Sequence, residues 1–277
     1  MPTALITGAS TGIGRATALR LAAAGWTVLA GVRDPQAGEQ LVDAAAGGRV
    51  LALTLDVTDP EQIAQAAERI AKEGGRLDAL VNNAGIAIGG PLELIAEEDL
   101  RRQFDVNLFG QVAVTRALLG ALRQARGRIV FISSIGGRVA MAYTAPYAAS
   151  KHAIEAIGDA LRVELRSSGV QVALVEPGSV ATPIWDKGRA DAELVSVPAH
   201  LQQYYGHVQK AMDKTLEDTG RRGVPPEQVA ETIFKALTAR RMHARYLIGR
   251  DARAMLAIKR ILPARAFDAV AKRALGV

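Results

Sequence analysis

The start of the chain constrains the fold most, because a glycine-rich turn stands between a short apolar segment and a helix. Thr3–Thr7 is predicted to be a buried strand, and a helix is expected from Ile13 to about Ala24, where Gly25 ends it. This order lets the backbone approach a pyrophosphate at the positive end of a helix. The sequence therefore predicts a dinucleotide site. Its candidate residues are Gly8, Ser10, Thr11, Gly12, Ile13 and Gly14.

The same alternation of strands and helices continues along the chain. Six further strands are predicted at 27–32, 50–55, 78–81, 128–133, 170–175 and 245–248. Helices are predicted between them at 35–46, 59–73, 100–123, 147–167 and 226–240. Such alternation is typical of a parallel, doubly wound sheet. We therefore expect an α/β fold, a Rossmann-type seven-stranded parallel sheet with helices on both faces, forming one catalytic domain over residues 1–250.

Composition excludes several classes of protein. With 277 residues and 49% hydrophobic residues, the chain can bury one large core. The absence of cysteine excludes disulfides, thiolate metal sites and a cysteine nucleophile. An apolar strand at the N-terminus, with no signal peptide and no run of about 20 apolar residues, favours a cytoplasmic protein. No metal is expected, because the histidines lack ligand spacing. They are His152, His200, His207 and His243.

Positive charge is concentrated at the C-terminal end. From Arg240 to Val277 there are ten Lys and Arg residues and two Asp residues, whereas the rest of the chain has 24 basic and 26 acidic residues. A charge confined to one tail does not indicate nucleic-acid binding. Residues 251–277 are predicted to form an extension of two basic amphipathic helices that meet at Pro263. This extension either covers the site or a second subunit, or contacts an acidic membrane surface weakly.

The end of the second predicted strand indicates which dinucleotide is bound. A carboxylate there would hold the ribose hydroxyls of NAD, but this chain has Val32 followed by Arg33. Because a guanidinium suits a 2′-phosphate, we predict a preference for NADP(H), with NAD(H) possible. Alternatively, Arg33 is a solvated charge and Asp34 reaches the ribose. After the third strand, Asp56, next to Val57, is either an acceptor for the adenine amino group or a turn carboxylate.

A hydroxyl, a phenol and an amine in the middle of the chain have the pattern of an acid–base site. Tyr147 and Lys151 are four residues apart and lie on one face of a predicted helix. The ammonium is expected to lower the pKa of the phenol, which can then exchange a proton with an alcohol oxygen. Ser134, at the end of the strand before this helix, can hydrogen-bond the same oxygen. Asn107 lies among apolar residues in a predicted helix, so its amide needs a buried partner.

Taken together, these motifs resemble the classical short-chain dehydrogenase/reductase family. Gly136 and Gly137 after Ser134, and the Arg33 loop, are similar to the branch that acts on hydroxysteroids and retinoids. The matching segments, in chain order, are Thr7–Gly14, Asn82–Gly85, Asn107, Ser134 with Tyr147–Lys151, and Pro177–Thr182.

The resemblance implies a role for each matching residue. Tyr147 would be the general acid and base, and Lys151 would lower its pKa and hold the nicotinamide ribose. Ser134 would polarise the substrate carbonyl, and Asn107 would kink its helix and hold a water linked to Lys151. Ser133 is the more structural of the two serines. Further cofactor contacts are implied for Asn83, Ala84, Gly85, Pro177, Gly178, Val180 and Thr182.

The implied activity is NADP(H)-dependent interconversion of a lipophilic secondary alcohol and ketone, or of an alcohol and aldehyde, in a homodimer or homotetramer. Residues 183–224 are predicted to form a lid over the substrate. Two alternatives remain, namely a 3-oxoacyl-thioester reductase and a non-catalytic nucleotide-sensing protein on the same fold. The candidate substrate contacts are Val139, Met141, Tyr143, Trp185 and Tyr204.

Overall fold

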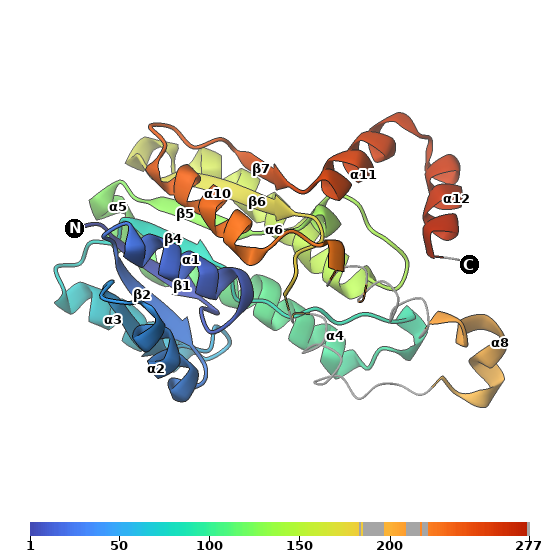
Figure 1. The fold of residues 1–277 in the computed structure, drawn as a ribbon, viewed down its shortest axis with the longest axis horizontal. Coiled ribbons are helices and arrows are strands. Elements are labelled where there is room, and N and C mark those ends of the chain that lie inside the picture. The colour runs from blue at the N-terminus through green and yellow to red at the C-terminus, as the bar shows by residue number, and fades with distance from the viewer. Residues whose placement is uncertain (183, 185–196, 209–216, 218–220, 276–277) are drawn as a thin grey trace.

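A parallel seven-stranded sheet forms the centre of the computed structural model, which describes residues 1–182, 184, 197–208, 217 and 221–275 (Figure 1). The strand order is β3-β2-β1-β4-β5-β6-β7, and every pair is parallel. This confirms the predicted Rossmann-type fold. The strands are β1 (Thr3–Thr7), β2 (Thr27–Val32), β3 (Val50–Thr54), β4 (Ala79–Asn82), β5 (Arg128–Ile132), β6 (Gln171–Pro177) and β7 (Arg245–Ile248).

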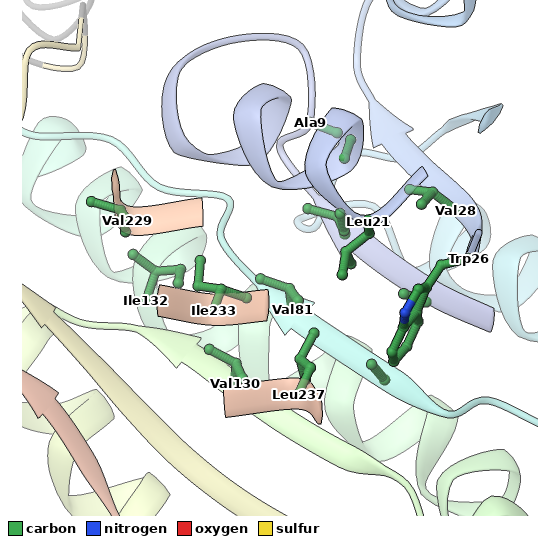
Figure 2. Close-up of a cluster of buried hydrophobic side chains, with 14 of the residues drawn as sticks. Ala9, Leu21, Trp26, Val28, Val81, Val130, Ile132, Val229, Ile233 and Leu237 are labelled. Atoms are coloured by element: carbon green, nitrogen blue, oxygen red, sulfur yellow. The ribbon is translucent and has the colours of Figure 1, made fainter. Parts of the chain in front are cut away.

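Helices cover both faces of the sheet and create two hydrophobic cores. The first core lies under α1 (Gly12–Ala23), α2 (Pro35–Ala44) and α10 (Pro226–Thr238). Figure 2 shows Leu21, Ile233 and Leu237 of this core near Val81 and Val130 on the sheet. The second core lies under α3 (Pro60–Lys72), α5 (Gln111–Ala125) and α6 (Ala145–Glu164).

Each central strand serves both cores. In β1, Ala4 and Ile6 belong to the first core and Leu5 to the second, because successive side chains of a strand point to opposite faces. A strand that is covered on both faces needs a continuous apolar sequence. This requirement explains why the strands were visible in the sequence as short uninterrupted apolar runs.

The sheet order reverses at β1, whose neighbours are β2 on one side and β4 on the other. At this reversal the carboxyl ends of two strands are tied together by side chains. The Thr7 hydroxyl accepts hydrogen bonds from the amides of Asn83 and Ala84, both at 3.0 Å. The Asn83 amide donates to the Thr7 carbonyl at 2.9 Å and to the Gly8 carbonyl at 3.0 Å. In open α/β sheets, ligands bind in the crevice at such a reversal.

The helix predicted at 100–123 begins earlier than predicted, at Glu97, and is interrupted around Asn107, where the resemblance implies a kink. The structure has α4 (Glu97–Phe104), a π-helical segment (Asp105–Gly110) and then α5. Asn107 is buried within the π-helical segment. Gly110 packs against the segment after β3, where a Cβ atom would lie 2.7 Å from the Val57 carbonyl oxygen. The residues after α6, predicted to belong to it, form a separate 3-10 turn at Arg166–Ser168.

Two helices follow β7, as predicted for the C-terminal extension. They are α11 (Arg250–Ile261) and α12 (Ala264–Leu275), and Pro263 lies between them. Phe267 is buried, and the ammonium of Lys259 lies 4.4 Å from the centre of its ring. Ile261 and Val270 are exposed on the outer surface of the extension. Within the described residues, every helix is too short or too polar to cross a membrane.

Substitution of Gly14 by alanine is expected to destabilise the protein by about 1–3 kcal/mol, because the new methyl group would collide with the Gly8 carbonyl and the Asn83 amide. The matched control is Gly120→Ala on α5, where a Cβ atom meets nothing within 4 Å. That change should be neutral or stabilising by up to about 1 kcal/mol. Urea unfolding of both variants is the measurement, and equal effects would contradict the close packing inferred at Gly14.

Candidate active site

One cavity of about 510 Å³ lies where the carboxyl ends of the strands meet. Residues that follow each of the seven strands line it, from Gly8 after β1 to Asp251 after β7. Its charged lining residues are Arg33 after β2, Asp56 after β3, Lys151 beside the end of β5, and Asp251 after β7. The cavity is therefore elongated across the sheet reversal and has polar groups at both ends.

The glycine turn forms the floor of this cavity. Gly8 and Gly12 have φ values of 64° and 54°, which side chains other than glycine rarely adopt. Gly12 lies against the segment after β6, where a Cβ atom would be 3.1 Å from the Thr182 methyl carbon. Ser10, Thr11 and Ile13 also line the cavity, whereas Gly14 lies behind it and allows α1 to approach β4. The turn lies directly before the start of α1, which is where the sequence predicts a pyrophosphate to bind.

The loop after β2 distinguishes between Arg33 and Asp34. The Asp34 carboxylate caps α2 by accepting a hydrogen bond from the Gln36 amide at 2.9 Å. Both residues are exposed, but only Arg33 lines the cavity. The geometry favours Arg33 as the residue that faces a bound nucleotide.

Asp56, which follows β3, was predicted to be either an acceptor for adenine or a turn carboxylate, and in the structure it stabilises a turn. Oδ1 of Asp56 accepts hydrogen bonds from the Thr58 amide at 2.9 Å and the Thr58 hydroxyl at 2.7 Å. Asp56 and the neighbouring Val57 also line the cavity. The turn therefore fixes the carboxylate at the edge of the site without removing it from the lining.

Three buried amide side chains on the α4–α5 unit hold the segment that follows β4. The Asn107 side chain accepts from the Ile86 amide at 2.8 Å and donates to the Ile86 carbonyl at 3.0 Å. It also donates to the Ser150 hydroxyl on α6 at 3.1 Å. The Gln103 side-chain oxygen accepts a hydrogen bond from the Ile88 amide at 2.7 Å, and the Gln111 side chain donates to the Ala84 carbonyl at 2.8 Å.

Gln103 and Gln111 were missed in the sequence. The signal was a polar amide every four residues, at 103, 107 and 111, within a partly apolar helix. Asn82, by contrast, has the structural role predicted for it, because its amide donates to the Thr115 hydroxyl at 2.8 Å. The three amides of the helix fix Ala84 and Gly85, which line the cavity as predicted.

Ser134, Tyr147 and Lys151 converge in the cavity, as the sequence predicted. The hydroxyls of Ser134 and Tyr147 are hydrogen-bonded to each other. Ser134 Oγ also accepts from the Gly136 amide at 3.0 Å, which fixes its rotamer. Lys151 is only 3% exposed, and its ammonium donates to the Ile132 carbonyl at 2.8 Å. The same ammonium lies 5.7 Å from the centre of the Tyr147 ring.

The predicted direction of the tyrosine pKa is wrong for this structure. Burial raises the pKa of Tyr147, and the hydrogen bond with Ser134 only opposes that rise in part. Burial also lowers the pKa of Lys151 to about 8, against the attraction of Glu155. Sequence reasoning counted the charge of the lysine but not the removal of water from both groups, which here is the larger effect. The phenol is therefore protonated at neutral pH.

A buried charge network lies behind Lys151. Glu155, one turn further along α6, contacts Arg245 of β7 at 3.1 Å, and Arg245 also contacts Glu176 of β6 at 3.0 Å. Arg138, in the loop after Ser134, contacts Glu176 at 3.0 Å. Burial and the nearby Glu176 raise the pKa of Glu155 to about 7, although Arg245 opposes the rise. The network joins three segments that line the cavity.

The candidate substrate contacts fall into three groups. Val139, Met141 and Tyr143 line the cavity as predicted. Tyr143 has a φ of 65°, and its hydroxyl lies 3.3 Å from Nε2 of His207. Tyr204 does not line the cavity; it is 60% exposed, and its ring lies edge-on to the ring of the neighbouring Tyr205. Trp185, and most of the proposed lid at 183–224, lie outside the described residues.

The far end of the cavity is formed by the segment after β6 and by the C-terminal extension. Pro177, Gly178, Val180 and Thr182 line it as predicted. Sequence reasoning missed three lining residues of α11. They are Asp251, Ala252 and Met255. For α11, the alternative in which the extension covers its own site is therefore the one found.

Comparisons with known proteins agree with this architecture. The family described as "short chain dehydrogenase" matches residues 2–193. Retinol dehydrogenase 5 of Mus musculus is 38% identical over 96% of this chain and 86% of its own length. The NADPH-dependent 3-dehydrocapnine reductase of Ornithobacterium rhinotracheale is 35% identical over 96% of this chain and 95% of its own. A short chain dehydrogenase/reductase from Burkholderia phymatum, solved with NAD, has a TM-score of 0.80 at 29% identity, covering 94% of this chain and 92% of its own.

The raised pKa of Glu155 predicts a pH dependence of stability. Between pH 4.5 and about 7 the folded protein holds a proton that the unfolded chain has lost. The contribution of Glu155 to the free energy of unfolding therefore falls as pH rises through this window. Relative to Glu155→Gln, the wild type should lose on the order of 1–3 kcal/mol across it.

Urea unfolding at several pH values measures this difference. Glu164→Gln is the control, because Glu164 is an exposed carboxylate on the same helix. A wild type and a Glu155→Gln variant whose stabilities change in parallel between pH 4.5 and 7 would contradict the raised pKa.

Proposed function

The chain belongs to the short-chain dehydrogenase family, and we propose that it is an NADP(H)-dependent oxidoreductase acting on a lipophilic alcohol or carbonyl compound. The reaction interconverts a secondary alcohol and its ketone, or an alcohol and its aldehyde. One observation carries the proposal. The Ser134 and Tyr147 hydroxyls and the Lys151 ammonium lie close together, and they line the same cavity as the glycine turn.

The cavity is suited to a nicotinamide dinucleotide along its length. The positive φ values of Gly8 and Gly12 keep the turn free of side chains, so that a pyrophosphate can reach the start of α1. Asn83, Ala84 and Gly85 line the middle, and Pro177 to Thr182 line the end beside Tyr147. When bound, the nicotinamide supplies or accepts the hydride. The remaining chemistry is assigned to the residues of the chain.

Tyr147 is the proton donor in the reducing direction. Its raised pKa keeps the phenol protonated, so that it can give its proton to the carbonyl oxygen as the carbonyl carbon is reduced. Ser134 donates a hydrogen bond to the same oxygen and polarises the carbonyl. The phenolate left behind is stabilised by the nearby Lys151 ammonium, whose own pKa of about 8 allows it to be charged at neutral pH. In the oxidising direction the same groups act in reverse. Asn107 supports Lys151 through the water that the family resemblance implies.

Arg33 supports the preference for NADP(H) over NAD(H). It is the exposed cation at the β2 end of the cavity, while the neighbouring Asp34 is committed to capping α2. One relative of this chain is NADPH-dependent by name, although a structural neighbour was solved with NAD. The charge and fork of the guanidinium favour a 2′-phosphate.

The substrate is proposed to be lipophilic because apolar side chains line the cavity that contains Tyr147. Val139 and Met141 come from the loop after β5, Ile184 from the start of the lid, and Met255 from α11. Apolar walls with a few convergent polar groups are typical of sites for apolar ligands. The names of two relatives, retinol dehydrogenase 5 and 3-dehydrocapnine reductase, agree with this class.

Other functions are less well supported. A 3-oxoacyl-thioester reductase shares the acid–base residues, but nothing in the lining favours a thioester over a free carbonyl compound. A purely nucleotide-sensing role would not require the buried Lys151.

We also propose that the protein is a homodimer or homotetramer in the cytoplasm. Weak contact of the extension with a membrane surface remains a proposal based on exposed Ile261 and Val270 among basic residues.

Replacement of Tyr147 by phenylalanine is expected to lower kcat by about 100-fold or more, because the phenol is the only proposed proton donor. NADPH binding should change little, since the ring itself is retained. The measurement is NADPH absorbance with a panel of lipophilic ketones and aldehydes. Equal turnover by wild type and Tyr147→Phe with every active compound would refute the enzymatic proposal.

Replacement of Arg33 by alanine is expected to raise the KM for NADPH by about tenfold to 100-fold, because one or two charge-assisted hydrogen bonds are lost. The KM for NADH should change by less than about threefold, since that cofactor lacks the 2′-phosphate. Arg116→Ala, an exposed arginine on α5, is the control. Equal changes for both cofactors would show that Arg33 does not read the 2′-phosphate.

A further inference from the structure

The first turn of α11 places a carboxylate against the backbone that follows β6. Oδ2 of Asp251 accepts a hydrogen bond from the Ser179 amide at 2.8 Å. A Cβ atom on Gly178 would lie 2.5 Å from both carboxylate oxygens. Gly249, which has a φ of 104°, has no room for a Cβ atom either, because Oδ1 of Asp251 would collide with it. Although Asp251 is exposed, its carboxylate therefore lies against two glycines and a peptide amide.

We infer that Asp251 is a positioning residue of the cofactor site, through which the C-terminal extension holds the turn at Gly178 and Ser179 in place. This inference rests on the proposed function, because that turn is assigned there to the nicotinamide. A carboxylate that accepts a backbone amide forms a charge-assisted hydrogen bond, which is shorter and stronger than a neutral one.

The other hydrogen bonds of the turn show what Asp251 adds. The Gly178 amide donates to the Ile248 carbonyl of β7 at 2.8 Å. The Ser179 carbonyl accepts from the Val224 amide at 2.9 Å. Backbone groups thus hold the turn on both sides, and the Ser179 amide between them is satisfied by a side chain. Since that side chain belongs to α11, any shift of α11 is transmitted to the turn.

The turn is also in contact with the other half of the cofactor site. It leads to Thr182, whose methyl group packs against Gly12 of the glycine turn. Asp251 and the neighbouring Ala252, which is buried, both line the cavity. The position of the extension therefore affects two parts of the site. One is the end of the cavity, and the other is the segment up to Thr182 that packs against the glycine turn. The extension is part of the site and not an appendage to a domain that ends at residue 250.

Hydrogen–deuterium exchange of the full-length protein without cofactor tests the contact itself. In Asp251→Ala the amide of Ser179 should exchange at least tenfold faster than in wild type, because its acceptor is lost, while β1 and β4 stay protected. Asp251→Asn keeps an acceptor oxygen and should restore most of the protection. Asp268→Ala, an exposed aspartate on α12, is the control. Unchanged exchange at Ser179 in Asp251→Ala would overturn the inference.

NADPH affinity, measured without substrate from the fluorescence of the reduced nicotinamide, tests the consequence for the site. Asp251→Ala should raise the dissociation constant about tenfold, Asp251→Asn by less than about threefold, and Asp268→Ala not at all. Should Asp251→Ala not fold, Asp251→Glu takes its place, because its longer side chain cannot fit between the glycines. Wild type that does not bind NADPH would refute the proposed function. Wild type and Asp251→Ala that bind NADPH equally would refute this inference alone.

Discussion

The burial of the Lys151 ammonium is the constraint around which the rest of the site is arranged. An ammonium removed from water needs a partner for its charge and for its hydrogen bonds. The Ile132 carbonyl, at the end of β5, supplies a hydrogen bond, and Glu155, one turn away on α6, supplies an opposite charge when it is ionised. Glu155 is itself buried and requires Arg245 of β7, which also serves Glu176. Lys151 and Glu155 thus link α6 to three adjacent strands, β5 through the Ile132 carbonyl and β7 and β6 through Arg245.

The doubly wound parallel sheet and the acid–base residues could be predicted because they depend on local sequence patterns. Strands covered on both faces have to be apolar throughout, and Asp59 with the proline after it predicts where α3 begins. Gly8 and Gly12 have positive φ values, and Gly14 has no room for a Cβ atom, so this turn needs glycine at all three positions. Ser134, Tyr147 and Lys151 could be placed together because a strand end and one helix face bring them there.

What could not be predicted depends on contacts between segments distant in the sequence. The side-chain amides of Gln103 and Gln111 find hydrogen-bond partners only when the segment after β4 lies beside their helix. The pKa of Tyr147 depends on how completely its surroundings exclude water, which a spacing of four residues does not reveal. Asp251 reaches the cavity only because β7 ends next to β6, so that α11 begins beside Gly178. Tyr204 shows the opposite error, because an aromatic residue in the predicted lid proved to be exposed.

The π-helical segment at Asp105–Gly110 has a consequence for the two glutamines on either side of it. In a regular α-helix, positions eight apart differ by about 80° around the axis, so Gln103 and Gln111 would face different directions. A π turn absorbs one extra residue, and the two positions then differ by only about 20°. This realignment allows both side chains to reach the same stretch of backbone, Gln103 at Ile88 and Gln111 at Ala84. The chain would tolerate the loss of a residue in a surface loop far better than in this segment, where it would rotate half of the helix away from the backbone it supports.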